Sequence, residues 1–228
     1  MASRIQWIRS SQPTLEAGVR LVEMLAEVDA CRGCARLAIP GGSALAALGE
    51  ARRLLDPGVW RRLRLTWVDE RCVPFAHADS NRGAAYRAKS LDGAWPTAVE
   101  LPLVLDGEAF EASCARVEAA LRQDFGGALD VLLLGLGEDG HIASLFPGHP
   151  WLSEPALVQP VSNSPKLPSD RISLCPAILR TASHVLLLAA GEGKRAALAR
   201  VQSGDPLLPT SFLPHLTIVT DIDLTVDD

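Results

Sequence analysis

Apolar runs of strand length alternate with amphipathic helical patterns along almost the whole chain. The helical patterns begin at Pro13, Ser43, Gly107 and Gly193, and the strand-like runs are 5–8, 35–40, 63–70, 129–137, 171–175, 184–191 and 216–221. This alternation predicts βαβ units. We therefore expect a doubly wound α/β fold, with a mostly parallel, Rossmann-like sheet and helices on both faces. No repeat or long linker divides the sequence, so we expect one domain over residues 1–228.

Two stretches depart from the alternation. Residues 71–91 have a loop-like composition with one short helical piece, and residues 151–170 contain four prolines. Proline lacks a backbone N–H and is rare inside strands, so we expect 151–170 to form an irregular excursion.

Composition narrows the class of partner. Hydrophobic residues make up 48% of the chain and the formal net charge is -5, without a long basic run. These values favour a globular protein whose main partner is not nucleic acid. The apolar runs are shorter than the ~20 residues of a membrane helix, and the N-terminus lacks the apolar centre of a signal peptide. We expect a cytoplasmic protein with no membrane partner, as a monomer or a small homo-oligomer.

The cysteine and histidine spacings indicate no metal centre. Cys31 and Cys34 have the C-x-x-C spacing of half a zinc site, but no second pair follows, so we interpret them as ordinary thiols. His141 and His149 lie eight residues apart with Pro147 between them, which matches no ligand pattern.

Polar residues gather where predicted strands end. Four segments have this position: Gly41-Gly42-Ser43, Asp69-Glu70-Arg71, Gly135 to His141, and Gly191 to Lys194. Ligands of open α/β sheets bind outside the carboxyl ends of the strands. The four segments are therefore expected to meet at one site.

Gly135, Gly137 and Gly140 spell the G-x-G-x-x-G pattern of a dinucleotide-binding loop directly after an apolar run. In that motif a helix continues from the third glycine, whereas here Pro147, Gly148 and Pro150 interrupt any helix. We expect no dinucleotide and no other cofactor. The glycines instead let the backbone turn tightly. We expect this turn to place Asp139 and His141 at the carboxyl edge of the sheet, where the ligand binds.

The string GLGEDGHIASLFPG (135–148) resembles the 6-phosphogluconolactonase family. Further matching segments follow in the family's order and cover most of the chain: WVDERCVP (67–74), SN (80–81), SPKLPSDRISL (164–174) and GEGK (191–194). The resemblance implies hydrolysis of 6-phospho-D-glucono-1,5-lactone, a small sugar-phosphate lactone. Two positions depart from the family pattern: Ala44 removes a hydroxyl from the glycine loop, and Cys175 stands where threonine is frequent.

Glucosamine-6-phosphate deaminases share the wider superfamily and the GHIA string. They carry a glutamate needed for acid–base work where this chain has Phe146, and a tyrosine where it has Arg71. Both differences favour the lactonase. A sugar-phosphate isomerase or deaminase, and a non-catalytic sugar-phosphate-binding protein, are the alternatives.

The resemblance also implies roles for individual residues. His141 is the expected general base, oriented by either Asp69 or Asp139. Arg71 is expected at the developing oxyanion or at the phosphate. Arg171 and Lys194 are expected to bind the phosphate, with the amides of the glycine loop Gly41, Gly42 and Ser43. Ser144 does not lie in a nucleophile elbow, so no acyl-enzyme is expected.

Overall fold

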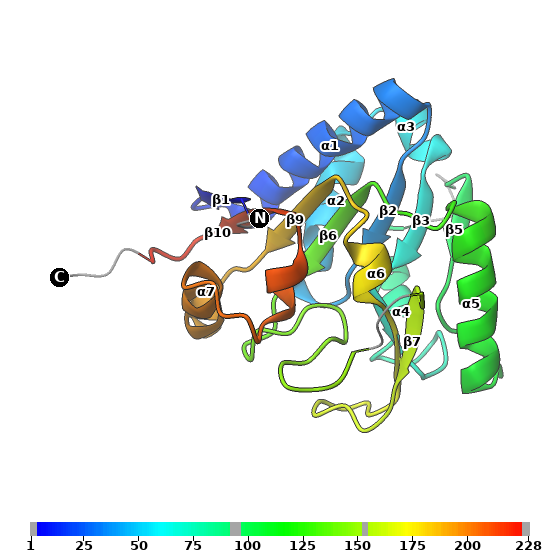
Figure 1. Ribbon diagram of the computed structural model, residues 1–228. Coiled ribbons are helices and arrows are strands. Elements are labelled where there is room, and N and C mark those ends of the chain that lie inside the picture. The colour runs from blue at the N-terminus through cyan, green and yellow to red at the C-terminus, as the bar shows by residue number, and fades with distance from the viewer. Residues whose placement is uncertain (1–3, 92–96, 152–154, 225–228) are drawn as a thin grey trace.

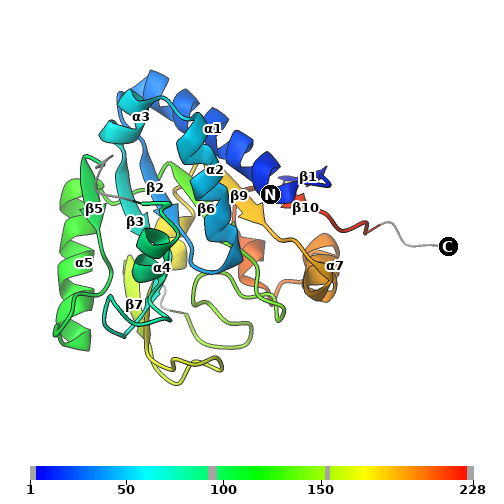
Figure 2. The same ribbon diagram turned by 180° about the vertical axis from the view of Figure 1, so that it is seen from behind.

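The computed structural model describes residues 4–91, 97–151 and 155–224, and its centre is a seven-stranded parallel sheet (Figure 1). The strand order is β1 (Arg4–Arg9), β10 (His215–Thr220), β9 (His184–Leu188), β6 (Val131–Gly135), β2 (Arg36–Ile39), β3 (Arg64–Trp67) and β5 (Val99–Leu101). Helices α1 (Pro13–Arg32) and α2 (Ala46–Leu54) pack together over one face, and α6 (Pro176–Leu179) lies over the other (Figures 1 and 2). The predicted doubly wound fold is confirmed.

The sheet reverses its winding direction between β2 and β6. From β2 the chain winds outward to β3 and β5, and it then returns to place β6 on the opposite side of β2. The crevice at such a reversal is the usual ligand position in open α/β sheets. The loops that leave β2 and β6 begin at Pro40 and Leu136, and they flank this crevice.

Local sequence explains the first helix and the central strand. Helix α1 starts with Pro13 in its first turn and ends at Gly33, whose φ of 75° provides the left-handed C-cap that glycine adopts without strain. Leu21 and Leu25 are fully buried on one helix face. Strand β6 is flanked on both sides, so its first four residues are buried, which explains its continuous apolar run.

The predicted strand 63–70 is wrong as one element, because the chain changes sheets at Val68. Its backbone N–H donates to Ile39 O of the large sheet, while its carbonyl accepts from Leu174 N. Strand β4 (Asp69–Arg71) then joins β8 (Arg171–Leu174) and β7 (Val158–Val161) in a three-stranded antiparallel sheet. The switch places Asp69 and Arg71 at the crevice.

The expectation of a wholly irregular segment 151–170 is also wrong, because β7 pairs with β8. The prediction relied on the prolines of this segment, and one of them, Pro160, lies within β7. Strand β7 lies at the edge of the small sheet, and an edge strand tolerates proline because one of its sides needs no N–H donor.

The remaining helices follow the predicted pattern with small shifts. Residues Ser43–Leu45 form a 3-10 turn (η1) before α2, and the other predicted helices appear as α5 (Phe110–Asp124) and as η2 (Glu192–Lys194) with α7 (Arg195–Gln202). The short helical piece within 71–91 is α4 (Asn81–Arg87), whose N-cap Ser80 accepts from Gly83 N. Besides β7, four short elements of the described residues were not anticipated: α3 (Pro57–Arg62), β5, α6 and η3 (Pro209–Phe212).

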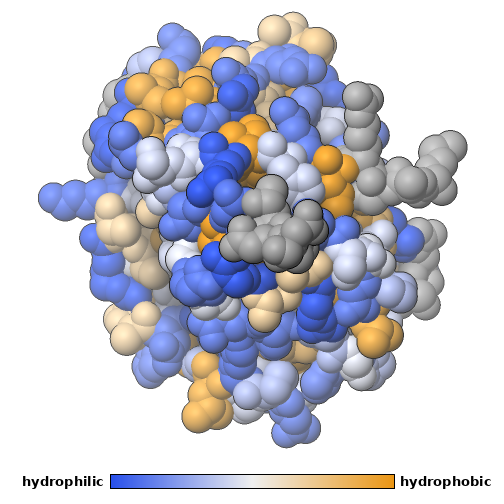
Figure 3. Space-filling view, turned by 90° about the vertical axis from the view of Figure 1, so that its left-hand side faces the viewer, coloured by the Kyte–Doolittle hydropathy of each residue, from blue (hydrophilic) through white to orange (hydrophobic). Residues whose placement is uncertain are grey.

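The outer surface beside β1, β10 and α7 is mostly hydrophilic, with hydrophobic residues scattered among polar ones (Figure 3). Within residues 4–91, 97–151 and 155–224, no helix combines the length and the apolar character needed to cross a bilayer.

Candidate active site

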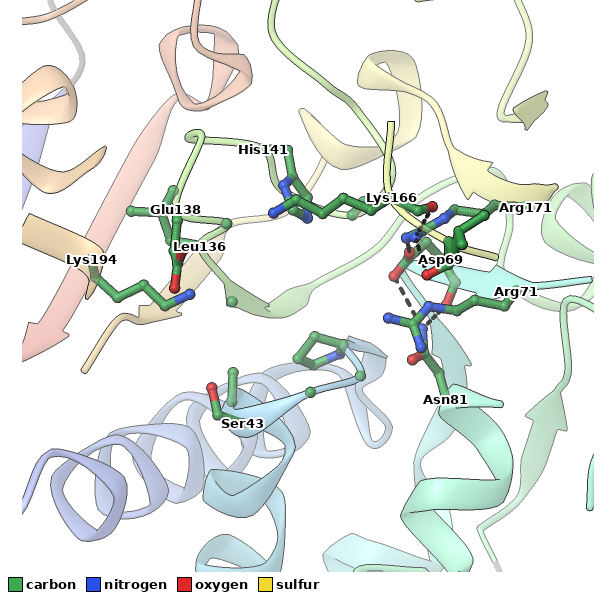
Figure 4. Close-up of a pocket in the computed structure, with 18 residues that line it drawn as sticks. Ser43, Asp69, Arg71, Asn81, Leu136, Glu138, His141, Lys166, Arg171 and Lys194 are labelled. Carbon is green, nitrogen blue, oxygen red and sulfur yellow. Dashed lines mark hydrogen bonds and ion pairs between the residues drawn. The ribbon is translucent and has the colours of Figure 1, made fainter. Parts of the chain in front are cut away.

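The four segments predicted to converge line one pocket at the carboxyl ends of β2, β6 and β9. Its volume is about 410 Å³. The pocket is lined by Gly41, Gly42, Ser43, Asp69, Arg71, His141, Arg171 and Lys194, among others. Figure 4 shows Lys194 and Ser43 on one side, Arg71, Arg171, Asp69 and Asn81 on the other, with His141 and Lys166 between them. Every predicted site residue except Asp139 lines the cavity itself, and Asp139 contacts His141.

The loop after β6 aims the imidazole of His141. Asp139 Oδ1 lies 2.6 Å from His141 Nδ1, and the loop is closed by a backbone hydrogen bond of 2.8 Å from Gly137 N to His141 O. A Cβ on residue 137 would lie 2.0 Å from His141 Nδ1, so only glycine leaves room for the imidazole–carboxylate pair. Gly140 turns the chain with φ of 90°. The glycine pattern therefore serves this pair.

The imidazole of His141 is largely enclosed. Its ring packs against the buried ring of Phe146 at a centroid distance of 4.6 Å. Burial lowers the pKa of His141 below its usual value, and it outweighs the Asp139 carboxylate, which raises it. For Asp139, burial raises the pKa, but the hydrogen bond from His141 and the charges of His141 and Lys166 outweigh it and hold that pKa below the usual range. The pair is therefore a neutral imidazole beside a carboxylate at neutral pH.

Asp69 belongs to a different set of contacts. Its Oδ2 accepts a 2.6 Å hydrogen bond from Ser144 Oγ, and its Oδ1 accepts from Asn81 Nδ2 at 3.3 Å. Arg171 Nη1 lies 3.9 Å from Oδ2. Of the two acids that the sequence offered as partners of His141, the structure places Asp139 in hydrogen-bond contact and ties Asp69 to buried polar groups.

Glu70, which was not predicted as a site residue, holds the backbone next to Asp69 in place. Its carboxylate accepts from the backbone N–H groups of Arg71, Asn81 and Arg82 at 2.7–2.8 Å and from Ser80 Oγ at 3.2 Å. Burial raises the pKa of Glu70, and these backbone donors oppose the shift. The carboxylate thereby fixes the start of α4 and the position of Asn81.

Two arginines face each other across β4 and β8, where Arg71 pairs with Arg171. Arg171 is buried and donates to Pro168 O at 3.0 Å and to Lys166 O at 2.7 Å. Arg71 donates to Asp79 O at 2.7 Å, while its Nε is buried without a hydrogen-bond partner in the part of the chain that the structure describes. The guanidinium group of Arg71 thus donates to fewer protein acceptors than that of Arg171.

The opposite side of the pocket presents backbone and lysine. Gly42 has φ of 66° and directs the chain into η1. The first amides of this turn lack intrahelical acceptors and suit an anion. Lys194 closes η2, and its side chain reaches into the pocket (Figure 4). This side combines N–H donors with one ammonium group.

Three polar side chains that line the pocket were not predicted as site residues: Asn81, Lys166 and Glu138. Asn81 and Lys166 stand in the segments SN and SPKLPSDR, which carry the family resemblance, and that resemblance is the sequence signal for both residues. Gly41 explains how Asn81 comes close, because a Cβ on residue 41 would lie 1.8 Å from Asn81 Oδ1. Glu138 lies between Gly137 and Gly140 in the loop that carries His141. This position is the one sequence feature that indicates a place at the site.

Among the described residues, no group of three or more histidine, cysteine, aspartate or glutamate side chains has the arrangement of a metal site. The cationic groups and the imidazole–carboxylate pair suit an anionic ligand and proton transfer.

Comparison with known proteins identifies relatives along nearly the whole chain. The family described as glucosamine-6-phosphate isomerases/6-phosphogluconolactonase matches residues 10–219. A 6-phosphogluconolactonase of Streptomyces coelicolor is 38% identical over 208 residues, covering 82% of this chain and 78% of its own. The human 6-phosphogluconolactonase is 36% identical over 220 residues, covering 88% and 84%.

Among solved structures, a putative 6-phosphogluconolactonase of Neisseria gonorrhoeae superposes with a TM-score of 0.80 at 25% identity, covering 96% of this chain and 99% of its own. The fold, the length and the sequence thus agree with one group of enzymes. The chain belongs to the glucosamine-6-phosphate isomerase/6-phosphogluconolactonase family.

Proposed function

We propose that the chain hydrolyses 6-phospho-D-glucono-1,5-lactone to 6-phospho-D-gluconate, with His141 as the general base. The observation that carries this proposal is the 2.6 Å contact between His141 Nδ1 and Asp139 Oδ1 inside a pocket lined by four cationic side chains. These cations are Arg71, Lys166, Arg171 and Lys194. The relatives of known name that share most of the chain carry the same activity in their names.

The phosphate is assigned to the side of the pocket that carries Lys194 and the amides of Gly42 and Ser43. Backbone N–H groups at the start of a helical turn, together with an ammonium group, bind phosphate through charge-assisted hydrogen bonds. Arg171 lines the pocket but donates to the backbone carbonyl groups of Pro168 and Lys166. Its predicted share in phosphate binding stays a prediction.

The chemistry requires a neutral imidazole. With Nδ1–H donating to Asp139, Nε2 is the ring nitrogen free to take a proton from the attacking water. The hydroxide adds to the lactone carbonyl, and the C–O bond to the ring oxygen then breaks. His141 returns its proton to that ring oxygen. Arg71, with unused donor capacity, is assigned to the developing oxyanion.

Phe146 favours the lactonase over the deaminase of the same family. The resemblance places a proton-transferring glutamate of deaminases at this position, whereas Phe146 packs its ring against His141. A phenyl ring cannot move protons. It instead excludes water from one face of the imidazole.

The test is hydrolysis of freshly generated 6-phosphogluconolactone, corrected for spontaneous ring opening, by the wild type and by His141→Asn. General base catalysis contributes roughly 10²–10⁴-fold, so we expect kcat to fall by about that factor in the variant. Circular dichroism and thermal melting of both proteins control for folding.

A parallel assay with glucosamine 6-phosphate distinguishes the alternatives. Deamination without lactone hydrolysis would assign the chain to the other branch of the family. Sugar-phosphate binding with neither activity would identify a non-catalytic binding protein. We also expect a cytoplasmic location, which cell fractionation tests.

A further inference from the structure

Lys166 lines the pocket but has no role in the proposed mechanism so far. It lies in the connection between β7 and β8, far in sequence from the loop that carries His141. Its Nζ lies 3.3 Å from Asp139 Oδ1, the same oxygen atom that contacts His141 Nδ1 at 2.6 Å. One carboxylate oxygen therefore serves an imidazole and an ammonium group.

The backbone around Lys166 is held firmly. Buried Arg171 donates to the carbonyl oxygens of Lys166 and Pro168, and Lys166 N donates to Ser164 Oγ at 3.2 Å. The side chain of Lys166 is about half exposed, so its ammonium group does not owe its position to burial. Its placement on Asp139 results from the fixed backbone and from the attraction of opposite charges.

A general base beside a carboxylate faces a conflict. The carboxylate orients the imidazole, but it also stabilises the imidazolium ion and so favours the protonated, inactive form. A second cation on the same carboxylate oxygen offsets part of this charge. It also disfavours a positive imidazole directly, because like charges repel.

We propose that Lys166 is a positioning residue that keeps His141 unprotonated: by binding Asp139 Oδ1, it lets the carboxylate orient the imidazole without drawing a proton onto it. The inference deepens the proposed function and rests on His141 being its general base. Lys166 acts here through Asp139 and takes no part in bond making.

Other charged groups surround the imidazole and act on it less directly. Asp69 raises the pKa of His141 through its charge, whereas Lys166 lowers it. Arg200 Nη1 donates at 3.0 Å to the backbone carbonyl of Asp139, not to its carboxylate. The guanidinium group of Arg171 lies 5.7 Å from the centroid of the Phe146 ring, and the ring of His149 packs edge-on against the same phenyl ring at 5.9 Å. The remaining charged groups around this pocket are Arg71, Glu138 and Lys194.

The experiment compares Lys166→Met with Lys194→Met. Both substitutions remove one positive charge from the same pocket, but only Lys166 contacts Asp139. Lys166→Arg restores the charge. The imidazole of His141 is titrated by NMR without substrate, its signal being assigned by its loss in His141→Asn.

We expect His141 in Lys166→Met to titrate at higher pH than in the wild type, with a smaller displacement in Lys194→Met and recovery in Lys166→Arg. The activity should show the same signature. The ratio of wild-type to Lys166→Met kcat/KM should grow as the pH falls and shrink as the pH rises.

Equal titration of His141 in the wild type and Lys166→Met would overturn the inference, as would equal displacements in the two methionine variants. The NMR titration needs no turnover. Failure of the proposed function, an absence of lactone hydrolysis by the wild type, is therefore distinguishable from failure of the role of Lys166.

Discussion

Two segments of the chain, one a loop and one a strand, bring an aspartate to the pocket or to its edge, and they hold it in opposite ways. The loop after β6 presents Asp139, whose side chain is 39% exposed and contacts His141 and Lys166. Strand β4 presents Asp69, whose side chain is 8% exposed and accepts from Ser144 and Asn81.

The comparison indicates that the two carboxylates, although chemically equal, have different roles. Both carboxylate oxygens of Asp69 accept hydrogen bonds from buried donors. These hydrogen bonds stabilise the fold as long as Asp69 stays in place. Asp139 contacts two groups that themselves face the ligand space. We infer that loss of Asp139 acts on the chemistry, and that loss of Asp69 acts mainly on the stability of the pocket wall.

Among changes to the two aspartates and the segments that carry them, Asp139→Asn gives the largest expected effect. An asparagine side chain is neutral, and it no longer offers a charged acceptor to Nδ1–H of His141. The tautomer and the orientation of the imidazole are then no longer fixed. We expect kcat for lactone hydrolysis to fall by roughly 10- to 1,000-fold. Because Asp139 raises the pKa of His141, the acidic limb of kcat/KM should also move to lower pH. An unchanged limb with normal kcat would remove Asp139 from the mechanism.

Gly137→Ala tests the same loop by sterics alone. The new Cβ would lie 2.0 Å from His141 Nδ1 and 2.5 Å from Asp139 Oδ1, so the pair must separate. We expect kcat to fall about tenfold or more, since misplacement of about 1 Å can cost 10²-fold. Gly135→Ala is the matched control, because its Cβ would meet only Ala44 Cβ at 3.3 Å. Equal activity of the two variants would contradict the steric role of Gly137.

Asp69→Asn should affect stability more than chemistry. The buried hydroxyl of Ser144 loses a charged acceptor and Arg171 loses its nearest carboxylate, which costs about 1–3 kcal/mol of unfolding free energy. For a chain of this length we expect the Tm to fall by roughly 2–10 °C. Asp139→Asn should leave the Tm nearly unchanged. The comparison fails if Asp139→Asn lowers the Tm more than Asp69→Asn, or if Asp69→Asn reduces kcat more.

The smallest expected effect is a pH dependence of stability. Burial lowers the pKa of folded His141 below its unfolded value of 6.5, so the unfolded chain takes up this proton first as the pH falls. His141 thus lowers stability progressively below about pH 6.5. The lowered pKa of Asp139 acts in a separate window, below its unfolded value of 3.8.

Thermal melting of the wild type and His141→Gln between pH 7.5 and pH 5 measures this effect. The wild type should lose Tm relative to the variant by no more than about 3 °C. A wild type that gains Tm relative to the variant at low pH would show that Asp139 outweighs burial.

Much of the fold follows from local pattern. The continuous apolar run of β6 and the Pro13 signal that opens α1 depend on nearby residues, and both elements appear where the sequence predicts them. Strands β5 and β7 were missed, because they are short and form only where a partner strand supplies hydrogen bonds. The change of sheets at Val68 likewise depends on Ile39 and Leu174, both remote in sequence.

For the site, the sequence determined which residue types stand after the strands and, through the topology of parallel sheets, that they meet at one edge. Only the tertiary structure decided which acid pairs with His141, because Asp69 and Asp139 are chemically identical and 70 residues apart. It likewise decided that Arg171 faces backbone carbonyls and that Lys166 shares the oxygen of Asp139. Such choices depend on contacts of a few ångströms between distant segments, and no local pattern in the chain specifies them.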